Sequence, residues 1–145
     1  MIALIQRVNW AQVHIESTLH ADIGQGILAL IGIEKEDDDK LAQKLLDKIL
    51  AYRIFADADG KMNLDVKDIG GDLMLVSQFT LAAETEKGLR PGFSSAKPPA
   101  EAEVIYDKLV QAAQSQHEFV RSGKFGADMQ VSLENDGPVT FILRV

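Results

Sequence analysis

Apolar and polar residues alternate along the first part of the chain in a pattern that predicts a long strand. Between residues 2 and 15 the apolar positions first share one parity, with Ile2, Leu4, Val8 and Trp10, and then change to the other. A phase change inside a period-two pattern is typical of a bulge or a bend. We therefore expect this strand to bend near Trp10.

A later run, 27–33, is apolar on both parities, which is typical of a strand that is buried on both faces. Residues 73–81 predict a second strongly apolar strand. Residues 37–53 and 101–116 change to helical periodicity, with apolar residues at three- and four-residue spacing. Acidic residues open the first of these helices, where the helix dipole favours them.

The C-terminal segment predicts a hairpin. Alternating apolar residues fill 129–133 and 139–145, and Asn135-Asp136-Gly137 between them is a turn signal. Strands outnumber helices, and most neighbouring elements are expected to be joined by short turns. The whole chain, residues 1–145, thus predicts a single α+β domain with a curved, largely antiparallel sheet and two main packed helices.

Composition narrows the functional classes. The formal net charge is −7, whereas proteins that cover long stretches of phosphate backbone are usually basic. Charge alone therefore points away from extensive contact with nucleic acid. The chain has no cysteine, which excludes thiolate nucleophiles and thiolate metal sites. No basic leader precedes the first apolar residues and no apolar run reaches the length of a membrane span, so we expect a cytoplasmic location.

Three candidate motifs favour structural interpretations. Residues 24–29 fit a loose dinucleotide fingerprint, but an apolar strand follows where a helix is needed. Residues 57–65 have the composition of a calcium loop without its glycine position or its closing glutamate, which favours a solvated turn. His14, His20 and His117 have no metal-ligand spacing, and no nucleophile elbow is present. A conventional catalytic triad stays open as a minor alternative.

The Ser-Gln-Phe-Thr segment at 77–80 ends an apolar strand with polar side chains. Strand parity points Gln78 and Thr80 to one side of the sheet. Such an end is either the emergence of the chain into water or a place where hydroxyl and backbone N–H groups meet a ligand. Gly137 and Pro138 have two similar interpretations, a plain turn or a functional unit. The second is open because only an X-Pro peptide bond adopts the cis form at low free-energy cost.

Several segments resemble the D-aminoacyl-tRNA deacylase family, first known as D-tyrosyl-tRNA deacylases. They are residues 1–8, 52–55, 59–64, 76–81, 90–94, 125–131 and 135–140. The segments follow the family's order and spacing over essentially the whole chain, and no signature position departs from it. The resemblance is therefore specific.

The resemblance implies a homodimer with a β-barrel-like core and active sites at the subunit interface. Each pocket would combine segment 77–80 of one subunit with Gly137 and Pro138 of its partner, joined by a cis peptide bond. The substrate would be the acceptor end of tRNA carrying a D-amino acid, and also glycyl-tRNA mischarged on tRNA(Ala). Hydrolysis of the ester would release the free amino acid and tRNA, and L-aminoacyl substrates would be rejected.

No cofactor and no metal are implied. Ester hydrolysis needs hydrogen-bond donors aimed at the developing oxyanion, and the backbone N–H groups of Phe79 and Thr80 are the candidates. Proton transfer would be assisted by the 2′-hydroxyl of the substrate ribose. Ser77 and Gln78 complete the catalytic segment, with Gln78 as a contact for adenosine or ribose.

Further candidates lie elsewhere in the resembling segments. Arg7, Phe125 and Met129 are candidates for substrate binding. Weak contacts with tRNA phosphates are expected from Lys87, Arg90 and Lys97. The main alternative function is a non-catalytic module that binds the acceptor end of tRNA.

Overall fold

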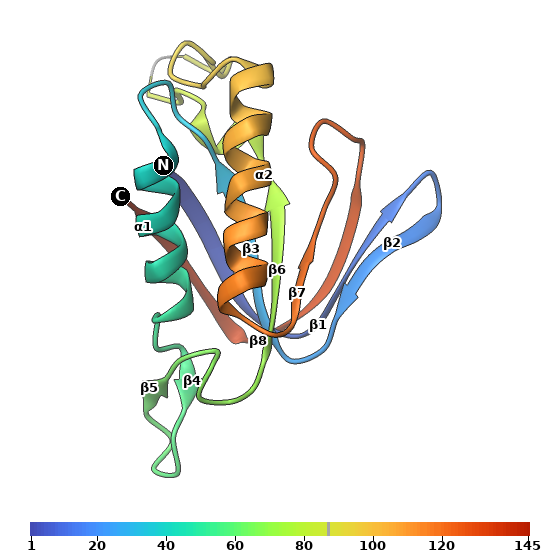
Figure 1. Cartoon of the computed structure of the whole chain (residues 1–145), viewed down its shortest axis with the longest axis vertical. Helices are drawn as coiled ribbons and strands as arrows, with labels where there is room; N and C mark the ends of the chain where they lie inside the picture. Colours follow the sequence, from blue (N-terminus) through green and yellow to red (C-terminus); the bar gives the residue numbers. More distant parts are fainter. Residues whose placement is uncertain (87) are drawn as a thin grey trace.

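The structure is a computed structural model that describes residues 1–86 and 88–145. Its strands are β1 (Ile2–Ile15), β2 (Thr18–Ile23), β3 (Gly26–Gly32), β4 (Phe55–Ala56), β5 (Met62–Leu64), β6 (Asp72–Ser77), β7 (Val120–Ser122) and β8 (Gln130–Arg144). Its helices are α1 (Asp39–Leu50), the short 3₁₀ helix η1 (Phe79–Ala82) and α2 (Pro99–Gln116). Helices α1 and α2 lie side by side over one face of a strongly curved sheet (Figure 1).

The main sheet is mixed. Its six strands run in the order β2-β1-β3-β6-β7, and β8 pairs with the other edge of β1. Strand β1 is antiparallel to β2, β3 and β8, whereas the β3–β6 and β6–β7 pairs are parallel. The expected α+β class, the curved barrel-like sheet and the two helices are confirmed. The parallel pairs arise because α1 and α2 are crossover connections, which short turns cannot replace.

The predicted C-terminal hairpin is wrong. Residues 130–144 form one strand, and both of its halves pair with β1 instead of with each other. Val8 faces Asn135 and Gln6 faces Thr140, so β8 carries extra residues between these two pairs. The Asn-Asp-Gly signal therefore marks a bulge in a continuous strand, because β1 is long enough, at 14 residues, to pair on both sides of it.

Strand β1 bends as expected, and the bend divides the core. Its first half buries Ala3 and Ile5 beneath the helices, and its second half buries Val8 and Ala11 in a separate cluster with β6. The ladder with β8 is irregular between Gln6 and Trp10. Trp10, the last of the apolar positions that share the first parity, is 39% exposed and is not part of either core cluster.

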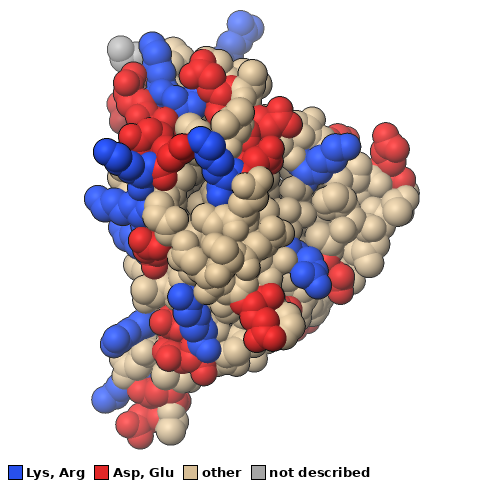
Figure 2. Space-filling model, viewed as in Figure 1, with Lys and Arg blue, Asp and Glu red and all other residues tan. Residues whose placement is uncertain are grey.

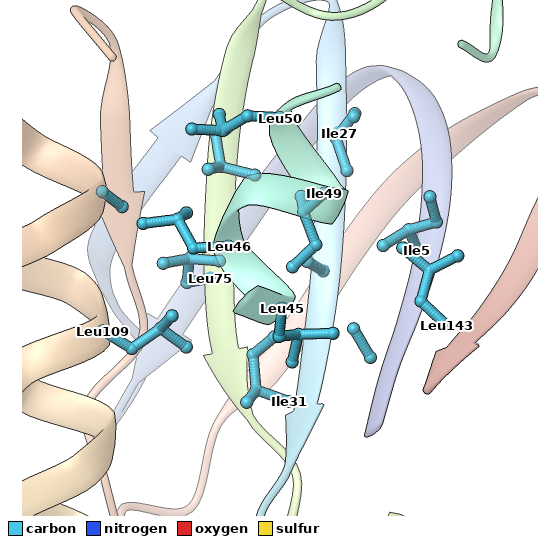
Figure 3. Close-up of a cluster of buried hydrophobic side chains, with 14 of the residues drawn as sticks. Ile5, Ile27, Ile31, Leu45, Leu46, Ile49, Leu50, Leu75, Leu109 and Leu143 are labelled. Atoms are coloured by element: carbon cyan, nitrogen blue, oxygen red, sulfur yellow. The ribbon is translucent and has the colours of Figure 1, made fainter. Parts of the chain in front are cut away.

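Helix α1 is the centre of the larger core cluster. Asp38 caps the helix by accepting a hydrogen bond from the Leu41 N–H at 2.9 Å. Leu45, Leu46 and Ile49 are fully buried and point at the sheet (Figure 3). Among the described residues, no helix has both the length and the apolar character needed to cross a membrane.

We predict that Leu46→Ala lowers the free energy of unfolding by about 2–5 kcal/mol, because it removes buried methyl groups and leaves a cavity. Lys44→Ala changes the exposed face of the same helix and is expected to stay within about 0.5 kcal/mol of wild type. Urea unfolding of both variants measures the difference. An equal, small effect of the two substitutions would show that α1 is not packed as described.

Candidate active site

A pocket of about 410 Å³ opens where β6 ends. This volume lies within the usual range for small-molecule sites. Its walls come from residues 76–79, from the first turn of α2 and from residues 125–131. The pocket brings together the predicted site residues Ser77, Gln78, Phe79, Phe125 and Met129. Apart from Ser77 and Gln78, its walls are largely apolar.

Gln78 directs the chain out of the sheet. Its N–H donates to the Ile31 carbonyl at 2.7 Å, which is the last contact of β6 with β3. The chain then turns into η1, and the Gln78 side-chain amide donates to the Thr80 hydroxyl at 2.6 Å. The first N–H groups of a helical turn have no acceptor within the turn. Phe79 and Thr80 therefore present N–H groups for an external acceptor.

The remaining contacts of Phe79 and Thr80 are few. The Phe79 ring is 49% exposed. It stacks on Phe93 with ring centroids 4.7 Å apart. Among the described residues, the Thr80 hydroxyl has no hydrogen bond to a histidine or a carboxylate. A base that would make this hydroxyl a nucleophile is thus absent from its described contacts.

Gly137 and Pro138 lie in the bulge of β8, and neither lines the pocket of its own chain. Both are exposed, and the peptide bond between them is cis. The Arg7 side chain on β1 fixes the preceding residue: its Nε donates to the Asp136 carbonyl at 3.1 Å and pairs with the Asp136 carboxylate at 3.0 Å. Arg7 also donates to the Ile54 carbonyl at 2.7 Å. The Arg7 side chain therefore lies against the β8 bulge and contacts it at Asp136.

The backbone at Gly137 requires glycine. Its φ of +132° lies in a region that L side chains rarely adopt. A Cβ there would lie 2.7 Å from the Val139 Cγ2 and 3.3 Å from the Arg7 Nη2. The Val139 N–H also donates to the Asn135 side-chain oxygen at 2.9 Å. The exposed Gly-Pro unit is thus held rigidly from several sides.

The predicted phosphate contacts differ in their surroundings. Arg90 is exposed and lines a second hollow of about 600 Å³, which also contains Glu84 and Glu86. Lys97 is only 9% exposed. Its ammonium donates to the Lys35 carbonyl at 2.8 Å, which connects the loop after β3 with the loop before α2. Lys87 lies outside the described residues. Figure 2 shows acidic and basic side chains interspersed on this face of the molecule.

The other candidate motifs have structural contacts. Residues 24–26 lead into strand β3 and not into a helix. The Asp57 carboxylate accepts hydrogen bonds from the Asn63 side chain and from the Asp59 and Lys61 N–H groups, which closes an exposed turn. These hydrogen bonds lower the pKa of Asp57, and the bond from the Asn63 side chain has the largest effect. His117 contacts the Gly71 carbonyl at 2.8 Å. Within residues 1–86 and 88–145 no group of three or more His, Asp or Glu side chains is arranged to hold a metal.

Sequence reasoning missed the contribution of α2. Pro99 and Ala102 line the pocket. Their positions in the sequence indicate only a helix start and an apolar stripe, which is also what a core-facing helix shows. Their role depends on how α2 packs over β6, and no local signal reports that.

The chain has a curved mixed sheet, two covering helices and an apolar pocket at the end of β6. Comparison with known proteins shows the family to which a chain with these features is similar. The family model described as D-Tyr-tRNA(Tyr) deacylase matches residues 4–144. A D-aminoacyl-tRNA deacylase of Stutzerimonas stutzeri (strain A1501) is 58% identical over 143 residues, with 99% of each chain covered. One from Enterobacter sp. (strain 638) is 54% identical over 145 residues, with 100% of each covered.

Two solved structures share the fold. The c-Myc DNA unwinding element binding protein superposes with a TM-score of 0.96 at 38% identity, covering 100% of this chain and 99% of its own. A probable eukaryotic D-amino acid tRNA deacylase gives a TM-score of 0.85 at 14% identity, covering 98% and 97%, which is a likeness of fold alone. The chain belongs to the D-Tyr-tRNA(Tyr) deacylase family.

Proposed function

We propose that the protein hydrolyses the ester bond of D-aminoacyl-tRNA and releases the free amino acid and tRNA. The observation that carries this proposal is the pocket at the end of β6, which has Ser77, Gln78 and Phe79 at its edge. Family membership over residues 4–144 supports the same activity. Residues 1–145 act as one deacylase domain in this proposal, in the cytoplasm, where aminoacyl-tRNA is used.

The proposed ester hydrolysis depends mainly on backbone groups and only to a small extent on side chains. An ester carbonyl that enters the pocket meets the N–H groups of Phe79 and Thr80, which stabilise the oxyanion that forms when water attacks. The Gln78 side chain offers an amide donor and acceptor to the ribose or the adenine. The neighbouring 2′-hydroxyl of the substrate ribose assists proton transfer. This arrangement would need no protein base next to Thr80, which agrees with the described contacts of its hydroxyl.

The proposal includes a homodimer with composite sites. Gly137 and Pro138 are exposed and do not line the pocket of their own chain, so a second copy would have to supply them. Phe79 beside the pocket and Ile142 on β8 are 49% and 61% exposed. Large exposed apolar side chains of this kind are typical of surfaces that a partner covers.

Chiral selection follows from a backbone wall. In the composite site the carbonyl groups of Gly137 and Pro138 accept hydrogen bonds from the substrate ammonium and leave space for a side chain in one direction only. An L side chain would meet the rigid backbone that Arg7 and Asn135 support, and its ammonium would lose its partners. Glycine has no side chain to reject, so glycyl-tRNA mischarged on tRNA(Ala) is a second expected substrate.

The test is hydrolysis of matched D-Tyr-tRNA and L-Tyr-tRNA, with glycyl-tRNA(Ala) as a third substrate. We expect rapid release from the D and glycyl substrates and at least about a hundredfold slower release from the L substrate, equivalent to about 2.7 kcal/mol. Light scattering of the same preparation should give the mass of a dimer. Binding of the substrates without release would support the non-catalytic module, and an active monomer would contradict the composite site.

We predict that the backbone N–H of Phe79, and not the hydroxyl of Thr80, carries catalysis. Thr80→Ala should keep kcat within about tenfold of wild type, since no base among the described residues contacts the hydroxyl. Phe79→Pro removes the N–H at the first position of η1, where proline fits. It should lower kcat by about 10²–10³.

Phe79→Ala is the matched control, because it removes the same ring and keeps the N–H. The ratio of kcat between Phe79→Ala and Phe79→Pro therefore isolates the donor. A Thr80→Ala protein that is folded and inactive would instead indicate covalent catalysis by the hydroxyl.

We predict that Gly137→Ala abolishes most D-substrate turnover, because the added Cβ would meet Val139 and move the Gly-Pro unit. Gly60→Ala is the control: Gly60 also has a positive φ, of +76°, but no atom lies within 4 Å of its added Cβ. Each substitution is expected to cost about 1–3 kcal/mol of stability from backbone strain. Turnover of D-Tyr-tRNA below the melting temperature of both variants should fall only for Gly137→Ala; equal turnover would show that the bulge lies outside the site.

A further inference from the structure

Tyr106 does not line the pocket itself but contacts the two segments that lead into its walls. It lies on α2, is 2% exposed, and reaches from the helix layer to the edge between β6 and β7. Its hydroxyl donates to the Leu75 carbonyl at 2.9 Å and lies 3.3 Å from the Gly123 carbonyl. Both carbonyls belong to the segments that separate to form the pocket.

The hydroxyl lies where the next bond of the β6–β7 ladder would be. The parallel pairing matches Leu73 with Val120 and Leu75 with Ser122. Its last bond is from the Gly123 N–H to the Leu75 carbonyl at 2.8 Å. The regular spacing of a parallel ladder would continue with a bond from the Ser77 N–H to the Gly123 carbonyl. The described residues do not make that bond, and the Tyr106 hydroxyl is there instead.

The two strands diverge from this point, and the pocket lies between them. Val76 begins one wall, and Phe125 begins the other. The Phe125 ring packs on the Tyr106 ring with centroids 5.9 Å apart. A Cβ on Gly123 would lie 2.7 Å from the Met129 sulfur, so the backbone there is in close contact with a residue that lines the pocket.

The protonation of Tyr106 suits a permanent bridge. Burial raises the pKa of its hydroxyl. The hydroxyl therefore keeps its one proton at neutral pH and continues to donate to the Leu75 carbonyl, with the Gly123 carbonyl 3.3 Å away. It is out of reach of solvent and has no role in the chemistry proposed above.

We propose that Tyr106 is a positioning residue of the deacylase site, whose hydroxyl replaces one bond of the β6–β7 ladder and so holds the Ser77–Thr80 backbone apart from the Phe125 loop. The inference rests on the proposed function. Without the hydroxyl, the Leu75 and Gly123 carbonyls lose this contact. The Ser77 N–H and the Gly123 carbonyl then either bond to each other, which narrows the pocket, or admit water. In both cases the Phe79 and Thr80 donors move.

Tyr106→Phe removes only the hydroxyl and keeps the ring that packs on Phe125. We expect kcat for D-Tyr-tRNA to fall about ten- to a hundredfold from misplacement of the donors, with KM changed less than about threefold. Amide hydrogen exchange at Ser77 and Phe79 should also become faster or change its pattern. Tyr52→Phe is the matched control, because Tyr52 is the other tyrosine in the chain and packs edge-on against Phe141.

The control is expected to match wild type in kcat, KM and amide exchange. Wild-type kcat, KM and exchange in a folded Tyr106→Phe protein would overturn the proposal. If that variant does not fold, hydrogen exchange in the wild-type protein tests the proposal. A slowly exchanging Tyr106 hydroxyl proton and a protected Ser77 amide support the bridge. Rapid exchange of both overturns it. A wild-type protein without deacylase activity would refute the proposed function instead, and the exchange measurements would then decide on the bridge alone.

Discussion

Strand β1 is paired along both of its edges, and the rest of the architecture depends on that pairing. One edge bonds first to β3 and then, beyond the bend, to β2, while the other edge bonds to β8 along most of its length. An extended strand with both edges satisfied leaves no unpaired backbone groups to bury or to shield. The bend lets one strand serve two core clusters, one beneath the helices and one against β6. The sheet curves because β1 does.

The same pairing produces the two halves of the proposed site. Because β8 follows β1 past its irregular region, the extra residues of β8 have to bulge outward, and Gly137 and Pro138 are presented there on a support made by Arg7. On the other side of β3, the parallel strands β6 and β7 part after Leu75, and the space between them is the pocket. A rigid exposed unit and a pocket that it does not reach in its own chain are what a composite site requires.

The negative charge of the molecule is compatible with this arrangement. A net charge of −7 and mixed surface charges argue against a long contact with phosphate backbone. In the proposed function, the last nucleotide and its amino acid would be recognised by a small apolar pocket, a few backbone donors and a carbonyl wall, none of which is charged. Lys97, one of the predicted phosphate contacts, is buried and donates to the Lys35 carbonyl.

Local patterns in the sequence determined most elements: the strands of 2–15 and 27–33, both helices, and the bend near Trp10. The strand predicted over 73–81 ends at Ser77, because the chain turns into η1 there. The local patterns also indicated the 77–80 segment and the Gly-Pro unit, since polar residues at a buried strand end and a proline at the start of a predicted strand are visible without coordinates. Pairing partners were decided only by the tertiary structure. Alternation and a turn signal predict that 129–133 and 139–145 form a hairpin, but the length of β1 offers a partner to both. The role of Tyr106 was equally hidden, because an apolar helical stripe looks the same whether its residues fill a core or bridge two diverging strands.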